Sequence, residues 1–296
     1  MSIPLLSIHL VVNTYLVLCI IANKHLAVST TTNISSNLIA ETMASNAPGA
    51  CCTVGTLHEG TPTGKSVQVG GKIEAYLALP AENEASQRAV LYLPDIIGIW
   101  QNSKLMADAF ARQGYACLVL DLFNGDPAPL NMPEDFDIMK WLQEGTGGKN
   151  PHTSETIDPI VVSGINYLKG LGITKIAAAG YCFGAKYAVR HYKSGIQCGF
   201  IAHPSFVEAD ELAAITGPLS IAAAEFDDIF PTEKRHESEA ILAQTKQNYQ
   251  INLFSGVHHG FSVRGDPKNE KERFGKEQAL YQAVSWFNRY FEAVGV

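Results

Sequence analysis

The chain has 296 residues, of which 46% are hydrophobic and 17% are charged, and its formal net charge is −7. This composition excludes a disordered, collagenous or coiled-coil chain, and the length allows one large domain or two modest ones. The acidic balance and the lack of a basic run argue against a nucleic-acid-binding protein. Six cysteines are too few for a disulfide scaffold, so we expect a reducing, cytoplasmic location.

Residues 1–46 are expected to be an extension outside the folded domain. Leu10–Ala22 is mostly apolar, but it is shorter than the ~20 residues of a spanning helix, and no Lys or Arg precedes it as in a signal peptide. Ser29–Asn46 is rich in Ser, Thr and Asn, which is typical of a flexible linker. Met43 opens a segment typical of a cytosolic start. The alternative is a secretory signal or membrane anchor within residues 1–28.

Residues 47–296 are expected to form one domain in which strands and helices alternate. The first elements are expected to be strands at Lys72–Leu79 and Ala89–Leu93, a helix at Ser103–Gln113 and a strand at Ala116–Phe123. An irregular excursion is expected at Asn124–Pro151, followed by a helix at Thr153–Gly170, a strand at Ile176–Ala179 and a helix at Phe183–Lys193. The remaining elements are strands at Cys198–Ala202, Leu219–Ala223 and Gln250–Phe254, with helices at Glu233–Thr245 and Phe274–Val294. Strands that are apolar throughout predict a mostly parallel sheet covered by helices on both faces.

One motif in this pattern predicts chemistry. Gly180-Tyr181-Cys182-Phe183-Gly184 fits G-x-C-x-G, and it lies between an expected strand and an expected helix. This is the setting of a nucleophile elbow, in which a tight turn exposes the nucleophile and requires small residues on either side. The other interpretation is a core cysteine that happens to lie between glycines.

An acidic residue and a histidine follow Cys182 in the chain order of α/β-hydrolases. Asp227 and its neighbour Asp228 follow one expected strand, and His258 and His259 follow the next. A thiol nucleophile needs an imidazole to handle its proton and a carboxylate to orient the imidazole. The residues alone leave open which Asp and which His serve, and an Asp pair in a loop can also be a solvated turn.

These residues resemble the dienelactone hydrolase family, whose members are α/β-hydrolases with a cysteine nucleophile. The resemblance runs from about Cys51 to Val296, and it is most specific at GYCFGA, at the D-x-x-x-P spacing after Asp227 and at His259-Gly-Phe. It implies a single-domain α/β-hydrolase fold and a catalytic triad of Cys182, Asp227 and His259. It also implies a thioester acyl-enzyme, an oxyanion hole from the backbone amides of Ile96 and Phe183, and no metal or organic cofactor.

Two departures from the family pattern bear on substrate binding. Asp95 stands where bacterial members carry a glutamate that holds the resting thiol. The Asp95 side chain is one methylene shorter, so the sequence does not decide whether its carboxylate reaches Cys182. Arg264 approximates one of two arginines that bind the substrate carboxylate, and Asn124 stands in the loop that carries the other. The resemblance with these departures implies a small-molecule lactone or ester rather than the small lactone acid of the type members.

Other motifs and alternatives are weaker. Cys51-Cys52 lacks a second Cys/His cluster, which argues against zinc. Trp100, Trp141, Phe123 and Phe261 are as consistent with core as with a pocket. A catalytically silent binding module is one alternative function, and a redox-responsive thiol protein is another, although no CxxC motif supplies a resolving cysteine. We expect no nucleic-acid or membrane partner, and a monomer or small homo-oligomer.

Overall fold

The computed structural model describes residues 43–81 and 87–291, which form one eight-stranded sheet. Its strand order is β1-β2-β4-β3-β5-β6-β7-β8, and all strands from β4 to β8 run parallel, whereas β1 and β2 are antiparallel to their neighbours. The strands are β1 Lys65–Val69, β2 Ile73–Ala78, β3 Arg88–Leu93, β4 Ala116–Leu120, β5 Lys175–Tyr181, β6 Cys198–Ala202, β7 Leu219–Phe226 and β8 Tyr249–His258. The predicted α/β-hydrolase fold class is confirmed.

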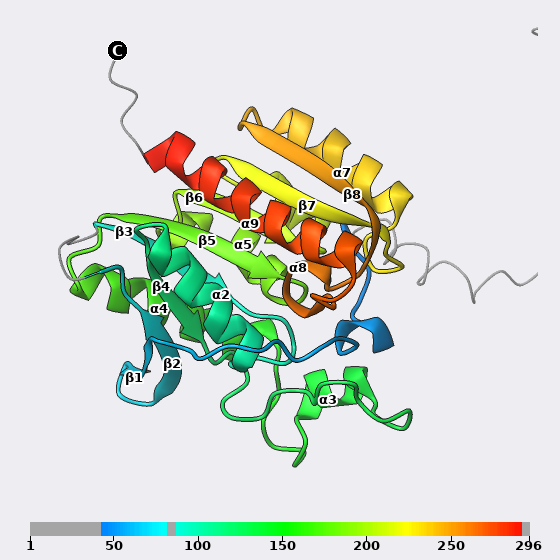
Figure 1. Ribbon diagram of the computed structural model, residues 1–296, viewed down its shortest axis with the longest axis horizontal. Helices are drawn as coiled ribbons and strands as arrows, with labels where there is room; N and C mark the ends of the chain where they lie inside the picture. Colours follow the sequence, from blue (N-terminus) through cyan, green and yellow to red (C-terminus); the bar gives the residue numbers. More distant parts are fainter. Residues whose placement is uncertain (1–42, 82–86, 292–296) are drawn as a thin grey trace, which may run out of the picture.

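Helices cover both faces of the sheet (Figure 1). The α-helices are α2 Gln101–Arg112, α3 Ile138–Glu144, α4 Ser154–Gly170, α5 Gly184–Arg190, α6 Ala209–Ala213, α7 Thr232–Gln244, α8 Phe261–Arg264 and α9 Glu270–Phe291. Short 3₁₀ turns occur at η1 Ala50–Cys52 and η2 Tyr192–Ser194. None of the helices in the described ranges is both long enough and apolar enough to cross a bilayer.

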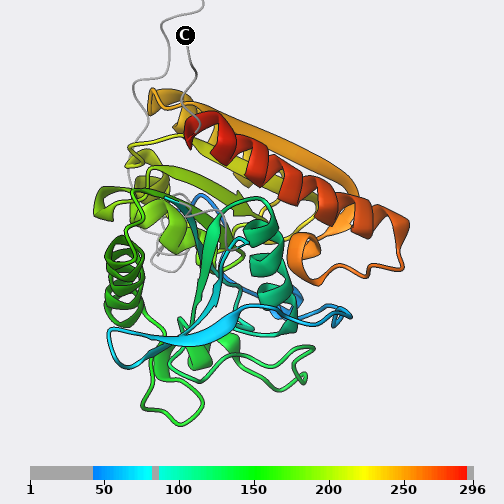
Figure 2. The same ribbon diagram turned by 60° about the vertical axis from the view of Figure 1, so that its left-hand side comes forward.

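Two hydrophobic layers hold these helices to the sheet. On one face, α2 and α9 bury aromatic and aliphatic side chains such as Phe110 and Phe287, whose rings lie 6.2 Å apart. On the other face, α4, α5 and α7 bury side chains such as Ile157, Tyr187 and Leu242. Figure 2 shows the sheet between α2 and α4. Both faces of β3, β4 and β5 are therefore buried, which explains why these strands are apolar along their whole length.

The structure contains elements that the sequence pattern did not predict. Strand β1 forms a hairpin with β2 through Gly70 and Gly71, which both have positive φ, so an antiparallel strand precedes the predicted one. Helix α3 lies inside the excursion that was expected to be irregular, and Asp137 caps it by accepting a hydrogen bond from the Lys140 amide. Helix α6 is only five residues long, too short to show a helical period.

The expected boundary of the domain after Asn46 is several residues too late. The backbone amides of Ala44 and Ser45 donate to the Val207 carbonyl, and Ser45 is fully buried. These small residues fit against the segment after β6, although their composition is typical of a linker. The folded part therefore includes Met43–Asn46. The expectation for residues 1–42, and for the last residues of the predicted closing helix, lies outside the described residues.

Candidate active site

Cys182 lies in a sharp turn between β5 and α5. Its φ is +50°, a left-handed conformation that is costly for a residue with a side chain. The turn is held on both sides, because the Cys182 amide donates to the Ala202 carbonyl and the Cys182 carbonyl accepts from the Ser205 amide, each at 3.1 Å. The predicted tight turn between a strand and a helix is present at this cysteine.

The two glycines of the motif are needed for close backbone approaches. A Cβ at Gly180 would lie 2.7 Å from the Ala185 Cα, inside the start of α5. A Cβ at Gly184 would collide with the Leu93 carbonyl at the end of β3. This second approach also brings the loop after β3, with Ile96, against the turn that carries Cys182.

His259 lies beside Cys182 and is oriented by Asp227. The His259 Nε2 atom is 3.2 Å from the Cys182 Sγ atom, and the Nδ1 atom is 2.9 Å and 3.0 Å from the two Asp227 carboxylate oxygens. The Asp227 Oδ1 atom also accepts from the amides of Ile229 and Phe230, both at 2.9 Å. These backbone donors fix the carboxylate, so the Nδ1–H donates to Asp227 and the Nε2 atom points at the sulfur.

The neighbouring acid and histidine lie outside this arrangement. Asp228 and His258 are exposed, whereas Asp227 and His259 are buried. His258 stacks obliquely on Phe226, with ring centroids 5.1 Å apart. Another histidine, His203, packs edge-on against His259 at 5.1 Å and hydrogen-bonds to Ser262. Burial lowers the pKa of His203 well below its usual value, so this ring supports His259 as a neutral group.

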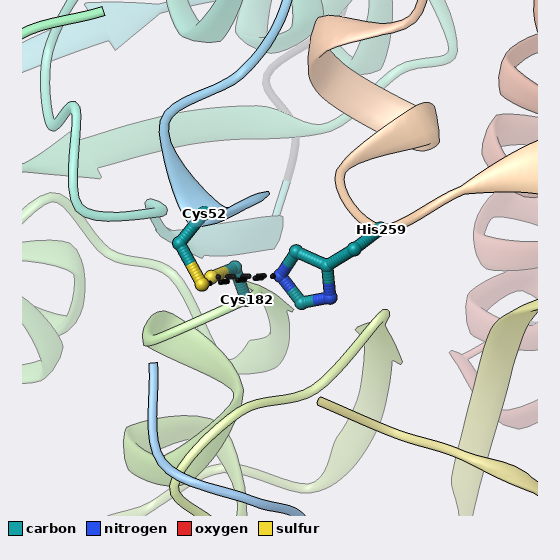
Figure 3. A group of neighbouring side chains, drawn as sticks. All are labelled: Cys52, Cys182 and His259. Carbon is teal, nitrogen blue, oxygen red and sulfur yellow. Dashed lines mark hydrogen bonds between the residues drawn. The ribbon is translucent and has the colours of Figure 1, made fainter. Parts of the chain in front are cut away.

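Cys52 is a member of the site that the sequence analysis missed. It lies in the η1 turn, and its Sγ atom is 3.5 Å from the His259 Nε2 atom (Figure 3). The two sulfurs and this nitrogen all lie within 4.8 Å of one another. The vicinal pair Cys51-Cys52 was the only local signal, and a contact across more than two hundred residues of sequence could not be read from it. Cys52 supplies the second thiol that no CxxC motif provides.

The surroundings of Cys182 favour a thiolate beside an imidazolium. Burial opposes ionisation of this thiol, but the hydrogen bond from Cys52 and the positive charge of His259 hold its pKa well below the usual value. Burial likewise opposes the charge on His259, but the negative charges of Cys182 and Asp227 raise the pKa of His259 to about 10. The hydrogen bond to Cys182 keeps Cys52 protonated, because it raises the pKa of Cys52.

Asp95 and Arg264 pair with each other next to the site. An Arg264 guanidinium nitrogen donates to an Asp95 carboxylate oxygen, and both side chains are almost completely buried. Arg264 also donates to the carbonyls of Val54 at 3.1 Å and Cys51 at 3.4 Å. The arginine therefore fastens the segment that carries Cys52 over the site, and its role as a substrate ligand stays a prediction. Asp95 likewise pairs with Arg264. Besides His259, the polar neighbours of the Cys182 thiol are Cys52 and the Ser205 hydroxyl, whose Oγ atom is 3.6 Å from the sulfur.

The other residues considered in the sequence lie around this centre. Asn124, at a φ of +51°, is exposed in the loop after β4, where its amide contacts Asn150 at 3.4 Å. Phe123, Trp141 and Phe261 are buried core residues, and the Phe123 ring lies 5.6 Å from that of Phe183. Trp100 is half-buried at the start of α2.

Two cavities reach His259, although the thiol itself is covered. One, of about 290 Å³, lies between Val54, Phe261 and Glu272, and the other, of about 480 Å³, reaches Cys51 and Asp227. Cys182 and Cys52 have no exposed surface. Cys52 in the η1 turn therefore contributes to the burial of the Cys182 sulfur.

Comparisons with known proteins identify the family of this chain. The model of the dienelactone hydrolase family matches residues 73–291. The chain is 47% identical to the hydrolase pyvD of Aspergillus violaceofuscus, over 84% of this chain and 100% of that protein. It is 45% identical to the hydrolase tropI of Talaromyces stipitatus, over 84% and 99%. A crystal structure titled as a putative dienelactone hydrolase from Klebsiella pneumoniae matches 77% of this chain and 99% of its own, with a TM-score of 0.62 at 13% identity. The chain therefore belongs to the dienelactone hydrolase family and is a hydrolase.

Proposed function

We propose that the enzyme hydrolyses a lactone or small carboxylic ester through an acyl-enzyme on Cys182. The observation that carries this proposal is the chain of contacts from Asp227 through His259 to the Cys182 sulfur, at 2.9 Å and 3.2 Å. Such a chain both ionises the nucleophile and keeps the proton available for the leaving group.

The reaction proceeds in two steps, acylation of Cys182 and hydrolysis of the thioester. The Cys182 thiolate adds to the carbonyl carbon, the ester C–O bond breaks, and the leaving oxygen takes the proton from the His259 imidazolium. Neutral His259 then accepts a proton from water, whose oxygen attacks the thioester. The C–S bond breaks, which releases the acid and restores the thiolate–imidazolium pair. In a lactone the leaving oxygen stays attached to the acyl group.

The backbone amides of Ile96 and Phe183 are the proposed donors to the oxyanion. Phe183 directly follows the nucleophile, and the loop with Ile96 is packed against the same turn through the approach of Gly184 to β3. Two backbone donors that point at a developing oxyanion need no rearrangement during the reaction, so they stabilise the transition state efficiently.

The surroundings favour a substrate without a carboxylate. The Arg264 guanidinium is already paired with Asp95, and Asn124 carries no charge. A substrate carboxylate that separated Arg264 from Asp95 would leave a buried charge without its partner, which is costly. We therefore expect at most a weak preference for lactone acids over neutral lactones or aryl esters. A cytoplasmic location stays a prediction from the cysteine usage.

The direct test is hydrolysis of an activated aryl ester and of a simple neutral lactone by the full chain. We expect measurable turnover that Cys182→Ala abolishes. The matched control is Cys117→Ala, because Cys117 is a buried cysteine in β4. Turnover that persists in Cys182→Ala at the level of the parent would refute the proposal.

A further inference from the structure

The cluster of Cys52, Cys182 and His259 contains more ligand atoms than acyl transfer needs. A cysteine hydrolase requires one thiol and one imidazole, yet here a second, fully buried sulfur lies 3.5 Å from the same Nε2 atom that faces Cys182. Figure 3 shows the two sulfurs side by side and both directed at this nitrogen. Three soft donor atoms therefore converge on one small volume from three separate parts of the chain.

The separations in this cluster match three corners of a tetrahedron around a metal ion. Zn–S bonds of about 2.3 Å and Zn–N bonds of about 2.0 Å at tetrahedral angles place sulfur and nitrogen about 3.5 Å apart and two sulfurs about 3.8 Å apart. The observed sulfur–nitrogen distances are 3.5 Å for Cys52 and 3.2 Å for Cys182, and the three ligand atoms all lie within 4.8 Å of one another. Only a small movement is needed to reach bonding distances.

The surroundings of His259 also resemble those of a metal ligand. A metal-bound histidine usually donates its other ring N–H to a carboxylate, which fixes the ring and raises its basicity. Asp227 provides this acceptor at 2.9 Å, and two backbone amides hold Asp227 in turn. The same contacts that prepare His259 as a base therefore prepare its Nε2 atom as a ligand.

We propose that Cys52, Cys182 and His259 form a binding site for a soft divalent cation such as Zn²⁺, and that the bound ion inhibits the hydrolase. Two thiolates and one imidazole select Zn²⁺ over hard cations such as Mg²⁺ and Ca²⁺, and they leave a fourth position for water. When the ion binds, Cys52 loses its thiol proton and the imidazolium loses the Nε2 proton. Two protons are released, and two thiolates then balance the charge of the ion.

The inhibition follows from which atoms the ion occupies, and this part of the inference rests on the proposed function. A metal-bound Cys182 sulfur cannot attack a carbonyl, and a metal-bound Nε2 atom cannot carry a proton. The cavity that reaches Cys51, Asp227 and His259 brings an ion next to one of the three ligands, and a small movement of the η1 turn then admits it to the two buried sulfurs. Zn²⁺ should therefore compete with ester substrates rather than assist their hydrolysis.

The binding test uses Cd²⁺ with the full chain in the presence of a phosphine reductant. Bonds between Cd²⁺ and thiolate give an ultraviolet charge-transfer absorption, so binding is measured without any enzymatic activity. We expect one Cd²⁺ per chain, displaced by Zn²⁺. Cys52→Ala and Cys182→Ala should each remove about half of the absorption and weaken binding by about a hundredfold or more, since loss of even an outer-shell partner costs about 10- to 100-fold.

Cys51→Ala is the matched control, because Cys51 lies in the same turn but outside the cluster. It should retain the full absorption, and circular dichroism should confirm that every variant is folded. An unchanged absorption in Cys52→Ala, or an equal loss in Cys51→Ala, would overturn the metal site.

The activity measurement separates this inference from the proposed function. One equivalent of Zn²⁺ should inhibit ester hydrolysis, and a chelator should restore it. In one outcome, Cd²⁺ binds, Cys52→Ala and Cys182→Ala lose absorption as expected, and saturating Zn²⁺ leaves turnover undiminished. This outcome would support the metal site and contradict the role of Cys182 and His259 in catalysis. Turnover that depends on Cys182 in a chain that binds no Cd²⁺ would support the proposed function and refute the metal site.

Discussion

The charge of His259 is expected to control the ionisation of Cys182, and His259→Ala tests this expectation. In the parent chain the pKa of Cys182 is held well below its usual value. The pKa of His259 is raised to about 10. The thiolate–imidazolium pair therefore breaks only when the pH falls through the low pKa of Cys182 or rises through the high pKa of His259. Removal of the imidazole leaves a buried thiol, whose pKa then rises to the ordinary value of about 8.5 or beyond.

The expected difference is in the shape of the pH profile. Because the pKa of the parent thiol is held well below its usual value, its alkylation rate with iodoacetamide should change far less between about pH 5.5 and about pH 7.5 than that of an ordinary thiol. A thiol with a pKa of about 8.5 or higher ionises about tenfold more for each unit of pH, so the rate in His259→Ala should rise about 100-fold over this range. The slope is a better measure than the rate itself, because thiolates of lower pKa are also weaker nucleophiles.

Peptide mass spectrometry assigns each alkylation to its cysteine. Cys51 is half-buried beside the site, so its alkylation in the same samples shows that the reagent reaches this region in both proteins. A parent profile that rises about tenfold per unit of pH across this range would show that Cys182 is an ordinary thiol and would refute the electrostatic account.

Three further predictions concern catalysis, folding and specificity. Cys182→Ala and His259→Ala should each lower kcat/KM by at least about a thousandfold, and the double variant should lose little more, because the residues act as one unit; steady-state kinetics measures this, and additive losses would contradict it. Gly184→Ala should lower the free energy of unfolding, measured by denaturant titration, by about 3 kcal/mol or more, because its Cβ collides with the Leu93 carbonyl. A decrease below about 1 kcal/mol would be inconsistent with the close approach. For a lactone acid and its methyl ester, the acid's advantage in kcat/KM should be about tenfold or less, because Arg264 is already paired; a thousandfold advantage would show that another cation binds the acid.

Local sequence patterns were sufficient for the central sheet and for the tight turn at Cys182. The strand at Cys198–Ala202 was predicted with the same bounds that the structure shows, because it is buried on both faces and therefore apolar throughout. The glycines that flank Cys182 revealed the tight turn, because only small residues fit there. The order of Asp227 and His259 after Cys182 predicted that the three residues lie close together, because each follows a strand of the parallel sheet and these strands end at the same edge.

Features that depend on contacts between distant segments could not be predicted. The pairing of Arg264 with Asp95 gave no sequence signal, because the two residues are far apart in the sequence and only the fold brings them together. Cys52 looked isolated because its neighbours Cys182 and His259 come from other parts of the chain. The linker-like residues before Ala47 pack into the fold through backbone hydrogen bonds, which leave no signature in composition.

The measurement that tests the central claim most directly is the location of the acyl group during turnover. The full chain is mixed with an excess of an activated aryl ester, quenched in acid within the first turnover, and analysed by intact and peptide mass spectrometry. We predict one acyl group per chain, bound as a thioester to Cys182 and absent in Cys182→Ala. An acyl group on any other residue, or rapid hydrolysis with no acyl group on Cys182, would contradict it.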